Sequence, residues 1–372
     1  MNSSDIAAAR VFVQIVTFKS LVVHGRQALE SCIKALTRLK GYKLGVNLTV
    51  VIRDNASEDG AAEFFKETCP SEIVFKENRY NLGFCGGQNQ GVKEFLDGDA
   101  GYLLVLNPDI ALQAESLSHL VQALECDARA GMATPKLYRA DAQLEPLKPL
   151  RLDAAGMRLT AALRHFDRGS GCAEDGSWNR AEYVFGGTGA CLLLKREFVE
   201  DMIFDLGEYE PDLGRVYPAL LGERDQRAQL FDEAFFAYRE DADLAWRAAQ
   251  RGWMCRYVPE AQAFHRRVVL PERRSELAPE LNLLGVKNRF LLQINNYTLG
   301  LGWRVFWEGL ILRNLLVLLA VIFKEHSSLR AFKELYVLSR RAKALRRLTR
   351  QRRRIKPAEL AKWFAATSED LD

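Results

Sequence analysis

Short apolar runs alternate with helical segments over the first 135 residues, and this alternation restricts the fold more than any other feature of the chain. The runs at 11–18, 46–52, 72–75 and 102–106 are rich in β-branched and other apolar residues, as is typical of strands. Helical spacing of apolar residues lies between or after them, at 25–39, 61–67, 88–96 and 117–125. Strands that alternate with helices form parallel sheets covered on both faces. We therefore expect an α/β fold with a mostly parallel sheet.

The remaining chain is less regular, and it sets the expected domain boundaries. Residues 139–182 have weak periodicity and predict a long excursion near a substrate site, and 207–229 resemble a surface insertion. Residues 253–258 suggest an edge strand, and the chain reads as helical from Leu281 onward. We expect one domain over 1–295, with two halves at about 10–138 and about 139–295. A helical, basic extension over 296–372 follows.

The number and spacing of the cysteines argue against some classes of protein. The seven cysteines are an odd number, and no pair has the CxxC spacing of a zinc site. A disulfide framework is therefore not expected, and the pattern fits a reducing compartment. The first ten residues, MNSSDIAAAR, lack the apolar core of a secretory signal, so none is predicted.

A carboxylate follows the buried strand at 102–106. The strand must end at Asn107-Pro108-Asp109, because proline cannot continue a central ladder. Asp109 could simply be a turn residue. It could instead hold a divalent cation, because ligands of α/β proteins bind at the carboxyl ends of strands, and such ions bind through one or two carboxylates plus substrate phosphates. His265 is a possible second ligand or a structural histidine.

Polar residues also follow the second and third strands. Asp54 and Asn55 could hydrogen-bond a base or ribose, or could form a turn. The loop 78–89 contains three glycines and three asparagines, which suits either a phosphate contact or a tight turn. No glycine fingerprint follows the first strand and no Walker loop is present, which argues against dinucleotide and P-loop enzymes.

Acidic residues open a helix near position 240. Asp241 could cap this helix or act as a general base beside apolar neighbours. Asp243 and Arg247 are spaced as i,i+4 partners. Three glycines between 186 and 189 interrupt a strand-like stretch, which suggests a bulge or a close approach of ligand to backbone.

These stretches, in this order, resemble the inverting family 2 glycosyltransferases of the GT-A fold, with greatest similarity to the bacterial rhamnosyltransferase branch. The matching residues are Thr17, Asp54-Asn55-Ala56-Ser57, Asn81-Leu82-Gly83-Phe84 with Gly87 and Asn89, Asn107-Pro108-Asp109, Gly186 to Ala190, and Glu240 to Arg247. The resemblance covers about residues 10–300. Asn107-Pro108-Asp109 stands where the wider family more often has Asp-x-Asp.

The resemblance implies a role for each matching position. The nucleotide-binding residues would be Thr17, Asp54 on the base, Asn55, Asn81, Gly87, Asn89 and Asn107. Asp109 and His265 would hold Mg²⁺ or Mn²⁺, and Asp241 would be the catalytic base. Residues 10–138 would form the nucleotide-binding half and 139–295 the acceptor half, and Gly187, Thr188, Glu240, Asp243 and Arg247 would lie on the acceptor side. The donor would be dTDP-rhamnose, with UDP- and GDP-sugars as alternatives, and the acceptor a cell-envelope glycan or a lipid-linked sugar. Relatives have Gly and Ser soon after the histidine, whereas Arg266 and Arg267 follow it here.

Charge and hydropathy change in the last quarter of the chain. Residues 324–356 contain 13 Lys or Arg and 2 Asp or Glu, a balance of +11 within a total of +4. An apolar stripe that includes Trp303 and Trp307 precedes them, which predicts a peripheral anchor on an anionic membrane or, alternatively, a helix packed on the domain. A nucleic-acid partner is not expected, because no recognisable module accompanies the charge. We expect a cytoplasmic protein on the inner face of the plasma membrane. A non-catalytic sugar-nucleotide or membrane-binding protein with this fold is the alternative.

Overall fold

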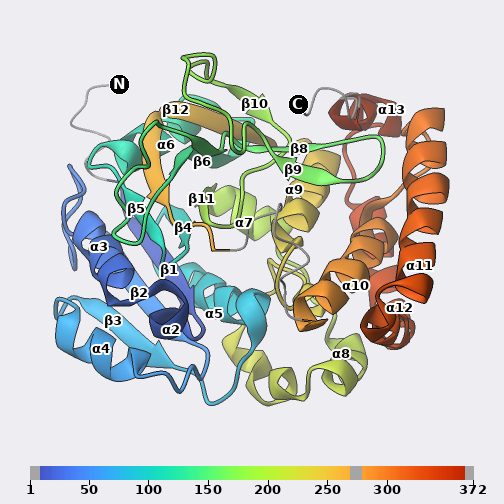
Figure 1. The fold of residues 1–372 in the computed structure, drawn as a ribbon, viewed down its shortest axis with the longest axis horizontal. Coiled ribbons are helices and arrows are strands. Elements are labelled where there is room, and N and C mark those ends of the chain that lie inside the picture. The colour runs from blue at the N-terminus through green and yellow to red at the C-terminus, as the bar shows by residue number, and fades with distance from the viewer. Residues whose placement is uncertain (1–8, 269–278, 365–372) are drawn as a thin grey trace.

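The computed structural model describes residues 9–268 and 279–364, so the N-terminal segment considered for a secretory signal lies largely outside the described residues. A ten-stranded sheet forms the centre of the molecule, with strand order β10-β12-β6-β11-β4-β1-β2-β3; β5 pairs with β12, and β7 with β6 (Figure 1). The first strands are β1 (Val11–Thr17), β2 (Leu48–Asp54), β3 (Ile73–Glu77) and β4 (Tyr102–Leu106), and they pair in parallel. The predicted mostly parallel α/β sheet is confirmed.

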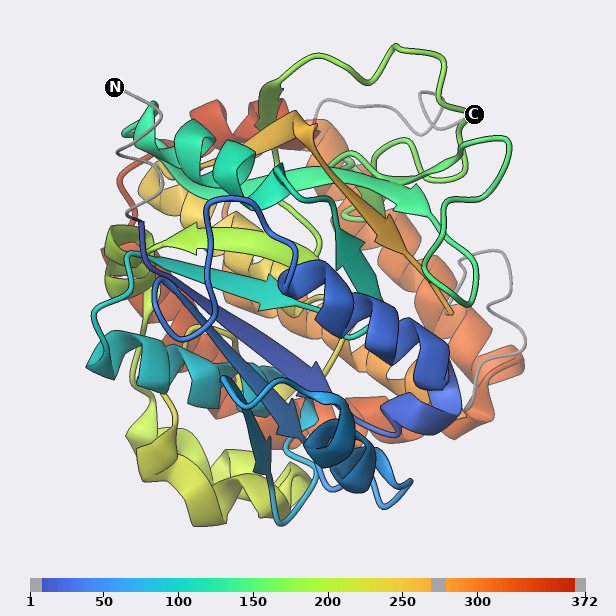
Figure 2. The same ribbon diagram turned by 90° about the vertical axis from the view of Figure 1, so that its left-hand side faces the viewer.

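Helices cover the sheet on both faces because the side chains of each strand alternate (Figure 2). In β1, Val11, Val13 and Ile15 pack with α3 (Arg26–Leu36), α4 (Ala61–Thr68) and α6 (Ser116–Glu125). Phe12 faces the other side, toward α5 (Gly83–Asp97) and α7 (Arg196–Met202). The short α2 (Ser20–His24) precedes α3.

The middle of the chain contains more regular structure than its pattern predicts. The strands are β5 (Ile110–Leu112), β6 (Ala130–Arg139), β7 (Leu152–Ala154), β8 (Met157–Leu159), β9 (His165–Asp167), β10 (Glu182–Val184), β11 (Cys191–Lys195) and β12 (Met254–His265). Strands of three residues are too short to show a period, which is why 139–182 reads as irregular. β12 lies between β10 and β6, so the predicted edge strand at 253–258 is wrong.

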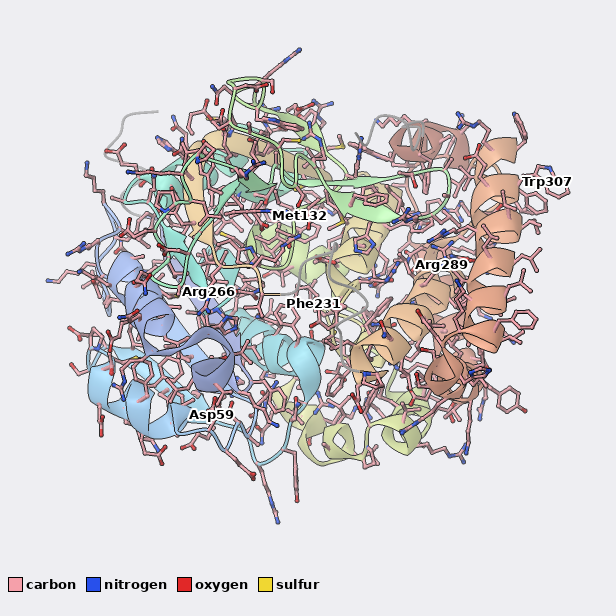
Figure 3. All side chains as sticks on the ribbon, viewed as in Figure 1. Asp59, Met132, Phe231, Arg266, Arg289 and Trp307 are labelled. Carbon is pink, nitrogen blue, oxygen red and sulfur yellow. The ribbon has the colours of Figure 1, made fainter. Side chains whose placement is uncertain are left out.

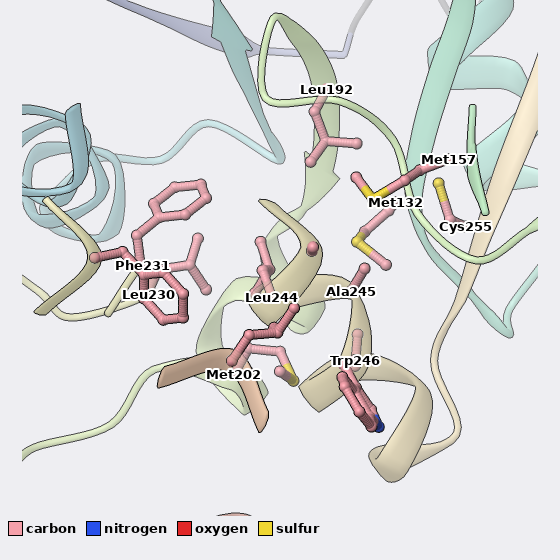
Figure 4. Packing of buried hydrophobic residues seen from close by; sticks show 14 of the residues in the cluster. Met132, Met157, Leu192, Met202, Leu230, Phe231, Leu244, Ala245, Trp246 and Cys255 are labelled. Carbon is pink, nitrogen blue, oxygen red and sulfur yellow. The ribbon is translucent and has the colours of Figure 1, made fainter. Parts of the chain in front are cut away.

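The helix α9 (Glu240–Arg251) is the centre of the larger hydrophobic core. Leu244, Ala245 and Trp246 are buried and pack toward residues of the sheet such as Met132 and Leu192 (Figure 4). Gly186 allows this approach, because a Cβ at that position would lie 2.5 Å from the Cβ of Ala245. Gly186 therefore has a packing role, because it lets α9 lie close to the sheet.

The segment 207–229 is more than a surface insertion. It forms η1 (Gly207–Tyr209), α8 (Glu210–Val216) and η2 (Pro218–Gln226), and η3 (Glu233–Phe235) follows. Leu213 and Leu220 are fully buried, and α8 packs against α12. The segment therefore belongs to the folded core and supports the C-terminal helices through the contact of α8 with α12.

The C-terminal region is helical, as predicted, and its basic part packs on the rest of the protein. Its elements are α10 (Pro279–Asn296), the π-helical η5 (Val305–Leu312), α11 (Arg313–Phe323), η6 (His326–Leu329), α12 (Arg330–Gln351), α13 (Pro357–Leu360) and η7 (Ala361–Phe364). α12 packs on α10 and buries Leu335, Leu338 and Leu345. Arg341 is fully buried and forms an ion pair with Asp232, which is also fully buried. A truncation near residue 295 would therefore remove part of the core.

The segment Val305–Phe323 differs from its neighbours because most of it is exposed. By length and composition alone it could cross a membrane, and only 17% of it is buried in the protein. Nine large apolar side chains between 303 and 323 are exposed: Trp303, Trp307, Ile311, Leu312, Leu315, Leu316, Leu319, Ile322 and Phe323. Trp307 points away from the molecule (Figure 3). Soluble monomers rarely leave so large an apolar surface uncovered.

Candidate active site

Two carboxylates lie at one edge of the central sheet and are joined by a short chain of backbone contacts. The Asp241 Oδ2 atom accepts a hydrogen bond from the Gly189 N–H at 3.1 Å. The next residue, Ala190, accepts a hydrogen bond from the Asn107 N–H at 2.8 Å. β11 runs antiparallel to β4, which brings its start beside the end of β4 and hence beside Asp109. The structure thus brings together Asp109 and Asp241, which are 132 residues apart in sequence.

Asp109 lies at the centre of a group of histidines and carboxylates. β5 pairs with β12 so that Ile110 is opposite His265. The Asp109 Oδ2 atom is 3.5 Å from His265 Nε2 and 3.4 Å from His24 Nδ1. His265 Nδ1 is 2.6 Å from the Oδ2 atom of Asp153, which is fully buried on β7. The arrangement is that of an imidazole ligand oriented by a second carboxylate.

Electrostatics make Asp109 an anionic group despite its burial. Burial alone would raise the pKa of Asp109, but the charge of His265, its hydrogen bond and His24 outweigh burial and lower that pKa. Burial likewise disfavours the charged form of His265, yet Asp109 and Asp153 raise its pKa to about 10. A cation held by His265 would therefore have to displace the proton from Nε2. Burial lowers the pKa of His24, so His24 is neutral at pH 7.

The side chains around Asp109 could bind a divalent cation, but they provide only part of its ligands. Asp109 Oδ1 is buried and has no hydrogen-bond partner, which is an unusual condition for a carboxylate oxygen. The Asp109 carboxylate suits Mn²⁺ or Mg²⁺, whereas an imidazole is a more usual ligand of softer transition metals, so Asp109 is the stronger candidate ligand of the two. Within residues 9–268 and 279–364, no three or more His, Cys, Asp and Glu side chains converge closely enough to hold an ion alone. An ion at Asp109 and His265 would therefore need further oxygens from its substrate.

Asp241 follows a strained loop at the start of α9. Phe236, Tyr238 and Arg239 have φ values of 66°, 68° and 71°, which non-glycine residues rarely adopt. The Asn288 side chain on α10 holds this loop, with its Nδ2 atom 2.7 Å from the Ala237 oxygen and 2.8 Å from the Tyr238 oxygen. Strain of this kind clusters at active sites.

The environment of Asp241 suits a general base. Its Oδ1 atom accepts a hydrogen bond from the Ala242 N–H at 2.7 Å and its Oδ2 atom accepts the bond from Gly189. Burial raises the pKa of Asp241, the Gly189 N–H opposes the rise, and the charge of Asp167 adds to it. A carboxylate with a raised pKa is a stronger base than one in water, while the two N–H groups fix its direction.

The other acidic residues of α9 lie inside the protein. Burial, together with the charge of Asp241, raises the pKa of Glu240 well above its ordinary value, and the Glu240 Oε2 atom has no described partner. Asp243 Oδ2 pairs with Arg247 Nε at 2.7 Å, and both are buried. Arg247 also donates a hydrogen bond to the Leu230 oxygen. Asp243 and Arg247 therefore brace α9 instead of facing an acceptor, which corrects the expectation from sequence.

Thr17 and Asp54 meet at the ends of β1 and β2, as their expected role in nucleotide binding requires. Thr17 Oγ1 donates to Asp54 Oδ1 at 2.7 Å, and the Ser57 N–H donates to Asp54 Oδ2 at 2.8 Å. Both side chains are buried at the carboxyl edge of the sheet. The Ser57 hydroxyl also donates to Asp54 Oδ1, so only Oδ2 has a lone pair left for a base, and a base contact by Asp54 stays a prediction.

The asparagines and glycine of the 78–89 loop have structural roles in the fold. The Asn55 Nδ2 atom donates to the Gly83 oxygen at 2.9 Å, and the Asn81 Oδ1 atom accepts from the Gly83 N–H at 2.9 Å. A Cβ on Gly87 would lie 2.9 Å from Val16, so this glycine lets α5 approach β1. Asn107 is only partly buried at the sheet edge, and its contact with nucleotide stays a prediction.

Asn89 has no hydrogen-bonding capacity left for a nucleotide. Its Nδ2 atom donates to the Phe231 oxygen and to Glu233 Oε1, both at 2.9 Å. Its Oδ1 atom accepts from the N–H groups of Leu230 and Phe231. Two donors and two acceptors are the full complement of an asparagine side chain. Asn89 therefore joins α5 to the segment before α9, in place of the expected nucleotide contact.

The acceptor-side glycine and threonine also contribute to packing. A Cβ on Gly187 would lie 2.6 Å from Thr134, and Thr188 is buried with its Oγ1 atom 3.4 Å from the Ala190 N–H. The functional backbone group of this stretch is instead the Gly189 N–H. The sequence reasoning also missed His24, Asp153 and Asp167. Asp153 lies in a three-residue strand, and no local pattern distinguishes it.

Comparison with known proteins identifies the family. Residues 13–200 match the sequence profile of Glycosyl transferase family 2, a match that covers half of the chain and includes Thr17, Asp54 and Asp109. The chain therefore belongs to glycosyl transferase family 2, and its catalytic domain is a glycosyltransferase domain. This confirms the resemblance noted from the motifs.

One curated enzyme within this family is similar in sequence to the chain. The chain is 25% identical over 228 residues to N-acetylglucosaminyl-diphospho-decaprenol L-rhamnosyltransferase from two strains of Mycobacterium tuberculosis. The match covers 59% of this chain and 66% of that protein, which is slightly under two thirds of its length.

Several solved glycosyltransferase structures are also similar. GalNAc-T7 with UDP, GalNAc and Mn²⁺ has a TM-score of 0.49 at 12% identity, over 77% of this chain and 48% of that one. The Pyrobaculum calidifontis mannosyltransferase PcManGT, in complex with GDP-Man and Mn²⁺, has a TM-score of 0.46 at 14% identity, over 95% of this chain and 84% of that one.

Proposed function

We propose that this protein is an inverting glycosyltransferase that moves L-rhamnose from dTDP-rhamnose to a hydroxyl of a lipid-linked, envelope-glycan acceptor. The observation that carries the proposal is the sheet edge that holds Asp109 and Asp241 together through Gly189, Ala190 and Asn107. The choice of rhamnose and of a diphosphate-linked lipid acceptor rests on the mycobacterial relative. UDP- and GDP-sugars are the alternative donors.

Each carboxylate has a distinct role in this mechanism. Asp241 accepts the proton of the acceptor hydroxyl as that oxygen attacks the anomeric carbon, and the N–H groups of Gly189 and Ala242 hold it in place. Attack from the side opposite the leaving nucleotide gives inversion. Asp109 and His265 would hold Mg²⁺ or Mn²⁺, which supplies charge neutralisation at the departing diphosphate. Asp153 orients His265 for this task.

The direct test is transfer with a panel of dTDP-, UDP- and GDP-sugars, with and without Mn²⁺, onto a short prenyl-diphospho-N-acetylglucosamine. The expected result is metal-dependent transfer from dTDP-rhamnose, with inverted anomeric configuration by NMR. Retention of configuration, or binding of donors without any transfer, would contradict the proposal.

We also propose that the protein sits on the cytoplasmic face of the plasma membrane through the exposed apolar side of η5 and α11. The support is the exposure of Trp303 and Trp307, which are 73% and 55% accessible, and of the leucines beyond them. Tryptophan and leucine on one helix face favour the boundary between headgroups and acyl chains. The basic residues of α12 are partly used in packing, so the apolar contribution should dominate.

Co-sedimentation with phosphatidylglycerol vesicles tests this attachment. Replacement of Trp307, Leu315 and Leu319 by serine should release the protein, whereas Val46→Ser, at an exposed apolar position in the loop between α3 and β2, should not. Binding should survive high salt, because screening weakens charge attraction and leaves apolar burial intact. Release of the wild type by salt alone would show that charge, and not α11, holds it.

A further inference from the structure

Arg267 follows β12 and contacts two carboxylates that come from different strands. Its Nε atom is 3.1 Å from Asp153 Oδ1, and its Nη2 atom donates a hydrogen bond to Asp167 Oδ2 at 2.5 Å. Asp153 is on β7 and Asp167 is on β9. The Arg267 side chain is only 13% exposed and Asp153 is fully buried, so their ion pair is shielded from the water and salt that weaken ion pairs on a surface.

The contact with Asp153 leads to the cation centre. Asp153 divides its two oxygens between two partners, because Oδ2 is 2.6 Å from His265 Nδ1 while Oδ1 faces Arg267. His265 Nε2 in turn is 3.5 Å from Asp109 Oδ2. Arg267 therefore holds from behind the carboxylate that orients His265 toward Asp109.

The contact with Asp167 leads to the base. Asp167 pairs with Met157 across the β8–β9 hairpin, and the Met157 N–H donates to the Gly186 oxygen at 2.7 Å. Gly186 begins the stretch whose Gly189 N–H donates to Asp241. The hairpin is thus attached to the loop that holds the base, and the charge of Asp167 acts on Asp241.

The charges along this path alternate in sign up to the base. The path runs through Asp109, His265, Asp153, Arg267, Asp167 and Asp241. Arg267 is the cation between the last two carboxylates before the base. Removal of one partner from a shielded ion pair leaves the other charge uncompensated. Without Arg267, the base would therefore face an uncompensated charge of its own sign.

The groups around Asp241 come from three elements. Asp167 acts on it from β9, and Gly189 donates its N–H from the loop before β11. Glu240 is its neighbour on α9, and burial together with the charge of Asp241 raises the pKa of Glu240. Asp243, further along α9, is paired with Arg247. Asp167 is thus the charged group through which another part of the site can act on the base.

We propose that Arg267 is a positioning residue that joins the cation centre to the catalytic base, because it holds Asp153 behind His265 and compensates Asp167 beside Asp241. The inference rests on the proposed function for the roles of Asp109 and Asp241, but both effects of Arg267 can be measured without turnover. Arginine suits this position because separate N–H groups of one rigid fork reach the two carboxylates.

The first test is an NMR titration of the Asp241 carboxyl carbon in the full chain, with the resonance assigned by its loss in Asp241→Asn. Arg267→Met should raise the pKa of Asp241, because Asp167 then lacks its compensating charge. Asp167→Asn should lower that pKa, because a like charge has been removed. Arg267→Lys keeps the positive charge and should give a pKa close to that of the wild type. Opposite shifts in the first two variants are not expected from a purely structural ion pair.

The second test is the affinity for Mn²⁺, measured by EPR of the free ion in the presence of the nucleoside diphosphate that the wild type binds. Arg267→Met should weaken Mn²⁺ binding, by less than the roughly 10–100-fold loss usual for a residue that contacts a ligand directly. Asp167→Asn should leave Mn²⁺ binding unchanged, because Arg267 still holds Asp153. The matched control is Arg168→Met, which removes a similarly shielded arginine that pairs with Glu182 at 2.7 Å and should change neither quantity.

Two results would overturn the proposal. An Asp241 pKa that is the same in Arg267→Met and wild type, or that moves in the same direction in Arg267→Met and Asp167→Asn, would leave Arg267 as a structural ion pair only. Unchanged Mn²⁺ affinity in Arg267→Met would separate Arg267 from the cation centre. Thermal melts check that each variant is folded, and if Arg267→Met is not, the shift in Asp167→Asn decides the base side and Arg267→Lys, whose single ammonium cannot reach both carboxylates as the fork does, decides the cation side. Failure of the proposed function would appear instead as a wild type without transfer, and the NMR titration would still decide the role of Arg267.

Discussion

The Asp109 and Asp241 centres contain the same functional group at the same sheet edge, and the protein gives the two groups opposite properties. Asp109 is buried beside His265 and His24, and its pKa is lowered although burial opposes this. Asp241 is beside carboxyl groups and accepts hydrogen bonds from backbone N–H groups, and burial raises its pKa. Neighbours, and not burial, therefore decide which carboxylate can hold a cation and which can take a proton.

The largest expected effect is on the base. Asp241→Asn should lower kcat by roughly 10²–10⁴-fold, which is the usual contribution of a general base. Donor binding, measured by calorimetry with Mn²⁺ present, should stay within about twofold of wild type, because Asp241 contacts Gly189 and not the nucleotide-side residues. Turnover above a tenth of the wild-type value would show that another group takes the proton.

Asp109→Ala tests the cation side of the comparison. The alanine variant should lose the increase in nucleotide affinity that Mn²⁺ gives to the wild type, while metal-free nucleotide binding persists. Titrations with and without Mn²⁺ measure both quantities. If Mn²⁺ strengthens binding equally in the two proteins, Asp109 is a turn residue and the two carboxylates do not differ in the way proposed.

Asp153→Asn is expected to have a smaller effect on the same centre. Asp153 contacts His265 and Arg267, so its loss should weaken Mn²⁺ binding in the presence of nucleotide by roughly 10–100-fold, as is usual for a residue that orients a ligand. The exposed carboxylate variant Asp175→Asn is the control. An unchanged Mn²⁺ affinity would remove His265 from the metal-binding set.

The smallest effect on activity is expected at Glu240, the immediate neighbour of the base. Its raised pKa means that the folded protein keeps a proton that the unfolded chain loses above about pH 4.3. The contribution of Glu240 to the free energy of unfolding is therefore lost as pH rises above that value. Glutamine cannot ionise, so the Glu240→Gln variant does not lose this stability as pH rises. The difference in Tm between variant and wild type should be positive and should grow with pH, with kcat within a few-fold of wild type. A Tm difference that does not change with pH would mean that Glu240 is ionised in the folded protein.

The sequence predicts the Asp109 side of the molecule better than the Asp241 side. β1 to β4 and their helices follow from local periodicity, and the residues after them are functional candidates simply because they follow strands. The partners that tune Asp109 are different. Asp153 is in a three-residue strand, and only the pairing of β6 with β7 and β12 places it beside His265. His24 ends α2 and follows no motif, so only its contact with Asp109 reveals it.

Asn89 and Arg247 show the opposite difficulty. Their positions match a functional pattern, but the Asn89 side chain is saturated by buried hydrogen bonds, and Arg247 is held inside the protein by Asp243 and the Leu230 oxygen. A motif in sequence contains residues that build the site and residues that touch the substrate, and the two kinds are separated only by burial and hydrogen bonding.

The buried pair of Arg341 and Asp232 has a consequence for how the protein is made. Asp232 also accepts a hydrogen bond from Asn295 at 2.9 Å, and its charge acts on Asp243 of α9. While the ribosome has released α9 but not yet α12, Asp232 lies near Asp243 without its partner Arg341, whereas Asp243 already has Arg247. An unpaired buried charge costs roughly 3–5 kcal/mol, a large fraction of the stability of a domain. In the nascent chain, the segment before α9 that contains Asp232 should therefore stay unfolded until α12 has emerged. A chaperone would bind the chain at this segment.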